Sequence, residues 1–87
     1  MRLKIAVIGA GAWGTALAIS ASREGTGHAV QLWSRDPVAA HALQAHRSNE
    51  RYLPGVAFPP ALQCVSTPVL ALASWAQQHD LIVVGTP

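Results

Sequence analysis

The sequence is poor in charged residues and in cysteine, and each scarcity excludes a class of protein. Charged residues make up 11% of the 87 residues and hydrophobic residues 51%, a balance that excludes a disordered chain. The six Lys and Arg residues, against four Asp and Glu, are scattered, so we expect no nucleic-acid partner. The single cysteine, Cys64, has no partner for an internal disulfide. It predicts a small buried side chain in a reducing, cytoplasmic compartment.

Membrane-spanning and metal-binding patterns are also missing. Residues 5–22 carry no charge and follow a basic start, so a secretory signal is the alternative interpretation of this segment. Against it, three glycines, Trp13 and Thr15 interrupt the segment, which is shorter than the roughly 20 apolar residues of a membrane span. We therefore expect neither export nor membrane insertion. No metal site is expected either, because no metal-ligand spacing relates the four histidines, His28, His41, His46 and His79.

A glycine-rich turn is the most informative motif that is present. Gly9, Gly11 and Gly14 follow the spacing G-x-G-x-x-G of a dinucleotide-binding turn. The first glycine permits the tight turn, the second lets the backbone approach a pyrophosphate, and the third lets a helix pack closely on a strand. This turn predicts a cofactor whose phosphates bind the N–H groups at the start of the helix.

The segments around the turn give the motif the context that it requires. Residues 3–8 before it form an apolar run, as expected of a parallel strand that is buried on both faces. After it, Gly14, Ala18 and Ala21 recur at helical spacing beside Leu17, which predicts a narrow face of small side chains for contact with the sheet. Trp13 lies within the turn, where its indole would either cover the pyrophosphate or pack in the core.

Strand and helix patterns alternate along the remaining chain, which indicates parallel β-α-β units. The first helix is expected to end near Arg23–Gly25, with Gly25 or Gly27 as a left-handed cap. The pairs Asp36-Pro37 and Thr67-Pro68 each predict an N-cap followed by proline at the first helical position, and thus the starts of two more helices. We expect Trp33 and Trp75 to be packing residues. The expected strands are residues 3–8, 29–33, 62–66 and 81–84, with a loop at about 48–60.

These elements predict an α/β fold, namely a Rossmann-type doubly wound parallel sheet truncated to four strands in the order 3-2-1-4, with three helices. The cofactor crevice is expected between the first and fourth strands, with the nicotinamide half passing Thr86 and Pro87. Because the last strand would have an uncovered edge and face, residues 1–87 are interpreted as the N-terminal part of a dinucleotide-binding domain. The rest of that domain is expected outside this chain.

The residues at the end of the second strand bear on which cofactor is preferred. An acidic residue there would hold both ribose hydroxyls of NAD, but this chain has Ser34-Arg35. A hydroxyl and a guanidinium suit a 2′-phosphate, so we expect NADP(H) or NAD(H) to bind, with NADPH favoured. Asp36 follows directly. Its two interpretations are N-cap of the next helix and contact with a ribose.

Three segments together resemble the NAD(P)-dependent glycerol-3-phosphate dehydrogenases of bacteria. They are the glycine turn with its helix (residues 9–18), Leu-Trp-Ser-Arg-Asp (32–36) and Asn-Glu-Arg-Tyr-Leu-Pro-Gly (49–55). The resemblance implies that Trp13, Arg35 and Tyr52 contact the cofactor. Ala12 stands where the family often has serine, so its backbone N–H alone would bind phosphate. Asp36 stands where a basic residue or histidine is common, which would soften the preference for NADPH.

The resemblance also implies a reaction. The full protein would reduce dihydroxyacetone phosphate to sn-glycerol 3-phosphate for phospholipid synthesis, with the catalytic lysines and a helical substrate domain beyond Pro87. No catalytic residue is therefore assigned in this chain, and we expect no turnover from it alone. The possibility of a homodimer is left open. The alternatives are the cofactor half-domain of another NADP-dependent reductase and a non-catalytic nucleotide-sensing module.

Overall fold

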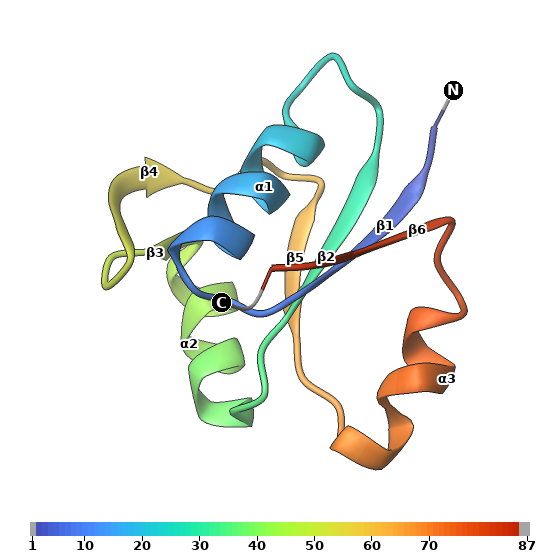
Figure 1. Ribbon diagram of the computed structural model, residues 1–87. Helices are drawn as coiled ribbons and strands as arrows, with labels where there is room; N and C mark the ends of the chain where they lie inside the picture. The colour runs from blue at the N-terminus through green and yellow to red at the C-terminus, as the bar shows by residue number, and fades with distance from the viewer. Residues whose placement is uncertain (1, 86–87) are drawn as a thin grey trace.

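Four apolar segments form a parallel sheet at the centre of the structure, a computed structural model that describes residues 2–85 (Figure 1). The strands are β1 (Lys4–Ile8), β2 (Ala29–Trp33), β5 (Leu62–Val65) and β6 (Leu81–Val84). Their order is β5-β2-β1-β6, which confirms the order 3-2-1-4 predicted for the four expected strands. All three pairings are parallel, so the carboxyl ends of the four strands lie at one edge of the sheet.

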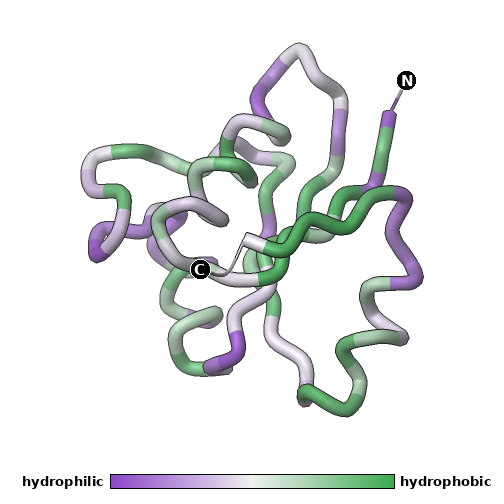
Figure 2. The backbone as a smooth tube through the Cα atoms, in the orientation of Figure 1, coloured by the Kyte–Doolittle hydropathy of each residue, from purple (hydrophilic) through white to green (hydrophobic). Residues whose placement is uncertain are grey.

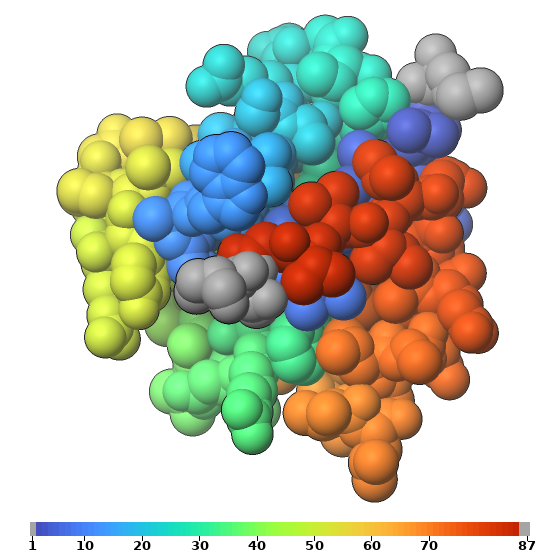
Figure 3. Space-filling model, in the orientation of Figure 1, coloured from blue at the N-terminus to red at the C-terminus, as the bar shows by residue number. Residues whose placement is uncertain are grey.

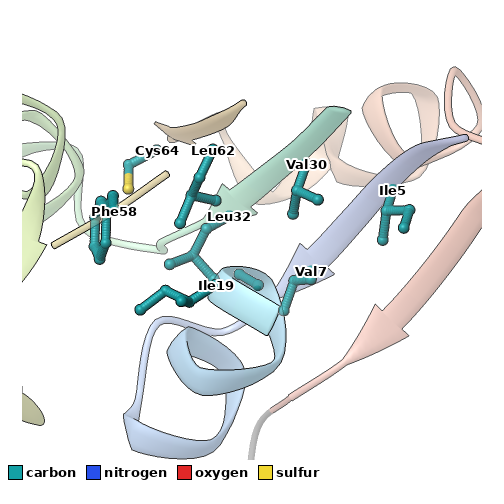
Figure 4. Close-up of a cluster of buried hydrophobic side chains, with 9 residues drawn as sticks. Ile5, Val7, Ile19, Val30, Leu32, Phe58, Leu62 and Cys64 are labelled. Carbon is teal, nitrogen blue, oxygen red and sulfur yellow. The ribbon is translucent and has the colours of Figure 1, made fainter. Parts of the chain in front are cut away.

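Helix α1 (Ala12–Ser22) packs on the sheet face from which Val7 and Leu32 project (Figure 4). The helix buries more than the expected stripe of small residues. Gly14 and Ala18 are buried as predicted, but Ala21 and Leu17 are only half-buried. The remaining buried positions of the helix are Thr15, Ile19 and Ser22. The core therefore receives one large side chain, that of Ile19, between the small ones.

The end of α1 differs from the prediction. The helix stops at Ser22, and its C-cap, Arg23, has an extended conformation with φ −58° and ψ 148° rather than a left-handed one. Gly25 and Gly27 do have positive φ, at 99° and 73°, but they lie in the turn that follows. There the Thr26 hydroxyl donates to the carbonyl oxygens of Ala21 and Arg23, which closes the end of the helix without a glycine cap.

Helix α2 (Pro37–His46) begins as predicted and leads into an unexpected hairpin. The Asp36 carboxylate accepts a hydrogen bond from the Val38 N–H at 2.9 Å, and Pro37 occupies the first turn. The helix ends at His46, and its C-cap Arg47 turns the chain with a φ of 57°. Strands β3 (Ser48–Asn49) and β4 (Leu53–Ala57) then form a two-stranded antiparallel sheet where a loop was expected. Figure 1 shows this hairpin beside α1 and α2, away from the main sheet.

The opposite face of the main sheet carries the short helices η1 (Val69–Ala71) and α3 (Leu72–Ala76). The cap predicted at Thr67-Pro68 is wrong, because Pro68 itself is the N-cap and no side chain caps η1. The Thr67 hydroxyl instead accepts a hydrogen bond from the buried Trp33 indole at 3.0 Å. The half-buried Trp75 donates to Gln31 on the same sheet face, so both tryptophans pack as predicted.

The β6 strand presents apolar side chains to the surface. Leu81, Ile82 and Val84 are 46%, 46% and 63% exposed. Figure 2 shows hydrophobic colour along this strand, and Figure 3 shows its atoms at the surface of the face in view. Within residues 2–85, no helix has the length and apolar character that a membrane crossing needs.

Candidate functional site

A cavity of about 700 Å³ opens at the carboxyl ends of β1 and β2. The glycine turn, the end of β2 and the hairpin each form one wall, through residues 9–11, 33–36 and 48–52. One face of α2 completes the lining with Ala39, Ala42, Leu43 and His46. Of the predicted cofactor-binding residues, five line this cavity: Gly9, Gly11, Ser34, Arg35 and Tyr52.

The glycine turn has the backbone geometry that its spacing predicts. Gly9 has a φ of 112°, and its N–H donates to the Trp33 carbonyl at 2.9 Å, which ties the turn to the end of β2. A Cβ on Gly14 would collide with the Gly9 carbonyl oxygen. A Cβ on Gly11, by contrast, would meet no atom within 4 Å. The first and third glycines thus serve the fold, while the space at Gly11 is open to a ligand.

The first turn of α1 offers backbone donors at the rim of this site. Gly11 is the N-cap and makes no side-chain cap bond, so the N–H groups of residues 12–14 have no intrahelical acceptor. The helix dipole adds a partial positive charge there, and together these features suit an anion. Ala12 and Trp13 are exposed and Gly14 is buried, and none of the three lines the cavity. Because Trp13 is 68% exposed, its interpretation as a core residue is wrong.

The end of β2 places polar side chains opposite the glycine turn. Ser34 is buried, and its N–H donates to the Val65 carbonyl at 2.9 Å, which fixes the backbone of this segment. Arg35 is exposed. Asp36 also lines the cavity, although its Oδ1 atom is occupied by the helix cap. The interpretation of Asp36 as an N-cap is thus confirmed, and a ribose contact stays a prediction.

The hairpin contributes both charge and an aromatic ring. Tyr52 is 46% exposed, and the guanidinium carbon of Arg51 lies 5.1 Å from the centre of its ring. The Glu50 carboxylate accepts a hydrogen bond from the Gly55 N–H at 3.1 Å. The two arginines of the cavity, Arg35 and Arg51, are therefore accompanied by two carboxylates, each of which accepts a backbone hydrogen bond.

Two parts of the cavity lining, one face of α2 and Asn49, were not assigned from the sequence. The face of α2 follows the helical spacing i, i+3, i+4, i+7 from Ala39 to His46, so periodicity could have identified it. Asn49 begins the 49–55 segment that carries the resemblance, but no role was assigned to it. It is only 4% exposed, and its amide donates to the Ala10 carbonyl and the Thr15 hydroxyl, which lie 39 and 34 residues earlier in the chain.

No predicted site residue lines a second cavity, which has about 420 Å³ and touches the amino ends of β1 and β2 through Lys4 and Ala29. Among the residues that the structure describes, no three His, Cys, Asp or Glu side chains cluster as metal ligands would. The predicted path of the nicotinamide past Thr86 and Pro87 lies outside the described residues.

Comparison with known proteins assigns this chain to a family. Residues 4–87 match the sequence profile described as the N-terminus of NAD-dependent glycerol-3-phosphate dehydrogenase. A protein of Acidovorax ebreus named glycerol-3-phosphate dehydrogenase, with the cofactor designation NAD(P)+, is 60% identical over 85 residues. That alignment covers 98% of this chain and 25% of the relative. A relative of the same name from Delftia acidovorans is 53% identical, with 98% and 24% covered.

A solved structure shares the fold. The crystal structure of glycerol-3-phosphate dehydrogenase from Coxiella burnetii superposes with a TM-score of 0.74 at 34% identity, over 95% of this chain and 24% of that one. The chain thus spans about a quarter of the length of the relatives that it matches. All three of these proteins are called glycerol-3-phosphate dehydrogenase, the name that the resemblance predicts, and none is named as another reductase or as a sensing module.

Proposed function

This chain belongs to the family of NAD-dependent glycerol-3-phosphate dehydrogenase N-termini, and on that premise we propose that its cavity binds the adenosine half of NADP(H) or NAD(H). The observation that carries the proposal is the open space at Gly11 beside the uncapped start of α1. A larger side chain at this position would fill the place where a pyrophosphate approaches the backbone. The residues 12–14 would then donate their N–H groups to the phosphate oxygens.

We propose separate roles for the other predicted contacts. Gly9 and Gly14 shape the turn, and the exposed indole of Trp13 covers the pyrophosphate from the first turn of α1. Ser34 and Arg35 hold the 2′-phosphate of NADPH at the end of β2. Tyr52 lies across the cavity on the hairpin, where its ring packs against the adenosine.

The activity follows from these roles and from the family. A bound nicotinamide supplies the hydride, and the protein holds it in place. For the whole protein we propose the reduction of dihydroxyacetone phosphate to sn-glycerol 3-phosphate. Residues 1–87 supply cofactor binding as the N-terminal part of the dinucleotide-binding domain, and no residue among them is proposed as catalytic. The preference for NADPH, the cytoplasmic location and the homodimer stay predictions of the sequence.

An amide NMR titration of the 87-residue chain tests this proposal. NADPH and NADH are added separately at one fixed salt concentration, because salt screens the phosphate contacts. We expect NADPH to shift the amide signals of Gly11, Trp13 and Arg35, and NADH to shift them less. A dispersed spectrum that neither nucleotide changes would contradict the proposal. Shifts confined to residues around Lys4 and Gln78 would move the site to the cavity at the opposite sheet edge.

A further inference from the structure

Asn49 links three segments of the candidate site through one buried amide. Its Nδ2 atom donates to the Ala10 carbonyl at 3.1 Å and to the Thr15 hydroxyl at 2.9 Å. Its Oδ1 atom accepts from the Tyr52 N–H at 3.4 Å. The side chain therefore joins the glycine turn, the first turns of α1 and the hairpin, and it lines the cavity as well.

The chemistry of these partners determines how the amide is oriented. A carbonyl oxygen can only accept a hydrogen bond, so the NH2 group must face Ala10. A backbone N–H can only donate, so the amide oxygen must face Tyr52. An aspartate at position 49 would have nearly the same shape, but its ionised carboxylate would place an acceptor against the Ala10 carbonyl. The position therefore requires an amide rather than any small polar group.

The bond to Ala10 has a consequence for the neighbouring residue. Ala10 and Gly11 share one trans peptide unit, in which the C=O and N–H groups point in opposite directions within a rigid plane. By anchoring the Ala10 carbonyl, Asn49 fixes the direction of the Gly11 N–H at the start of α1. Through its oxygen it also holds the backbone of Tyr52, whose side chain lines the opposite wall of the cavity.

We propose that Asn49 is a positioning residue for cofactor binding, which aligns the glycine turn with the hairpin before the dinucleotide enters. This inference rests on the proposed function, since it assumes that the cavity holds a dinucleotide. Asn49 acts through Ala10 and Tyr52, so it is a positioning and not a catalytic residue. If the glycine turn is misplaced, its N–H groups lose charge-assisted hydrogen bonds to the phosphate. The loss of each bond raises the Kd about tenfold or more.

The test compares the Kd for NADPH of the 87-residue chain with that of three variants, by isothermal titration calorimetry. Asn49→Asp is expected to raise the Kd about tenfold or more. The substitution removes the hydrogen bond to the Ala10 carbonyl and adds a negative charge beside the glycine turn. Thr15→Val removes one partner but keeps the bond to Ala10, so we expect an increase of less than about threefold. Ser22→Ala is the matched control, because it removes buried hydrogen bonds from the far end of α1 and leaves the turn intact.

A phosphorus NMR spectrum of bound NADPH separates positioning from general destabilisation. We expect both variants to be less stable in urea unfolding, because each loses buried hydrogen bonds. We expect the pyrophosphate signals to move only in Asn49→Asp and to stay in place in Ser22→Ala. If Asn49→Asp does not unfold cooperatively, Asn49→Ser replaces it, and the expected increase in Kd is smaller but in the same direction. Unchanged Kd and phosphorus signals in the folded variant would overturn the inference.

The wild-type chain in the same assay distinguishes the two proposals. NADPH binding by the wild type together with an unchanged Kd in the Asn49 variants would refute the positioning role and leave the proposed function standing. No NADPH binding by the folded wild type would overturn the proposed function and the role of Asn49 with it.

Discussion

Gly14 and Gly85 lie against each other where α1 passes the end of β6, with so little space that a Cβ on Gly85 would be 2.7 Å from the Gly14 Cα. The Gly85 N–H donates to the Ile8 carbonyl at 2.8 Å, which extends the pairing of β6 with β1 up to this point. The backbones of α1, β1 and the end of β6 are thus in direct contact at this point. Gly14 is therefore required for the packing of α1 against the end of β6, as well as for the glycine turn.

Substitution of Gly14 is expected to act on stability. In Gly14→Ala the new methyl group collides with the Gly9 carbonyl oxygen, and α1 must move away from β1. We expect the free energy of unfolding to fall by about 1 to 3 kcal/mol, the usual cost of overpacking. Urea unfolding followed by circular dichroism measures this, and a loss below about 1 kcal/mol would show that the helix shifts easily.

Substitution of Gly11 is expected to act on binding instead. The Cβ in Gly11→Ala enters open space, so the stability cost is that of a poorer N-cap, about 1 kcal/mol or less. The same methyl group occupies the proposed path of the pyrophosphate, so the Kd for NADPH should rise about tenfold or more. Calorimetry and urea unfolding on one preparation separate the two effects. Equal affinity in variant and wild type would exclude phosphate contact at Gly11.

Removal of the charge of Arg35 is expected to change cofactor preference. Arg35→Gln loses the guanidinium proposed to hold the 2′-phosphate, so the Kd for NADPH should rise about tenfold while that for NADH changes less than about twofold. Arg23→Gln is the control, because Arg23 is an exposed arginine at the C-terminal end of α1 and does not line the cavity. An equal rise for both nucleotides in Arg35→Gln would place Arg35 near a group that they share.

The two interpretations of Asp36 can be separated by a pair of variants. Asp36→Ala removes the cap bond to the Val38 N–H and should cost about 1 kcal/mol of unfolding free energy. Asp36→Ser keeps a capping oxygen and should cost little. If the carboxylate serves only as the cap, Asp36→Ser also leaves the Kd for NADH unchanged. A marked rise of that Kd in Asp36→Ser, with stability retained, would indicate a ribose contact.

The buried Cys64 thiol predicts a loss of stability at alkaline pH. Burial raises the pKa of Cys64 from 9.0 to about 11, and the nearby charge of Arg47 offsets part of that effect. Well below pH 9 the thiol is protonated in both the folded and the unfolded state. Between pH 9 and 11 it ionises mainly in the unfolded chain, so stability should fall by at most about 1.4 kcal/mol per pH unit. Urea unfolding at several pH values checks this, and Cys64→Ala should show a shallower fall; parallel curves would contradict it.

The sheet could be predicted because its signals are local. Each strand is a short apolar run, and the alternation with helices leaves few topologies open. The start of α2 was likewise predicted from Asp36-Pro37, where the cap and its N–H donor lie two residues apart. The walls of the cavity at Gly9–Gly11 and Ser34–Arg35 follow from the same reasoning, because the ends of parallel strands meet at one edge.

The missed features depend on contacts between distant residues. Pro54 and Gly55 signal a loop, but in a two-stranded sheet each strand is an edge, where a proline is tolerated, so β4 forms through them. Thr67 does not cap a helix because η1 begins after Pro68, and the Thr67 hydroxyl instead accepts from the Trp33 indole, 34 residues earlier. The role of Asn49 rests on partners in the glycine turn and α1. No window of sequence around these residues contains the competing interaction.

The walls of the cavity come from stretches far apart in the chain, and this has a thermodynamic consequence. Residues 9–11, 33–36 and 48–52 surround a common space only when the sheet, α2 and the hairpin are all in place. A ligand of this space binds the native state and has nothing comparable to bind in the denatured ensemble. At 100 times its Kd, such a ligand would stabilise the native state by about 2.7 kcal/mol. The concentration of free dinucleotide would therefore determine how fast proteases degrade this chain, as well as how much of its site is occupied.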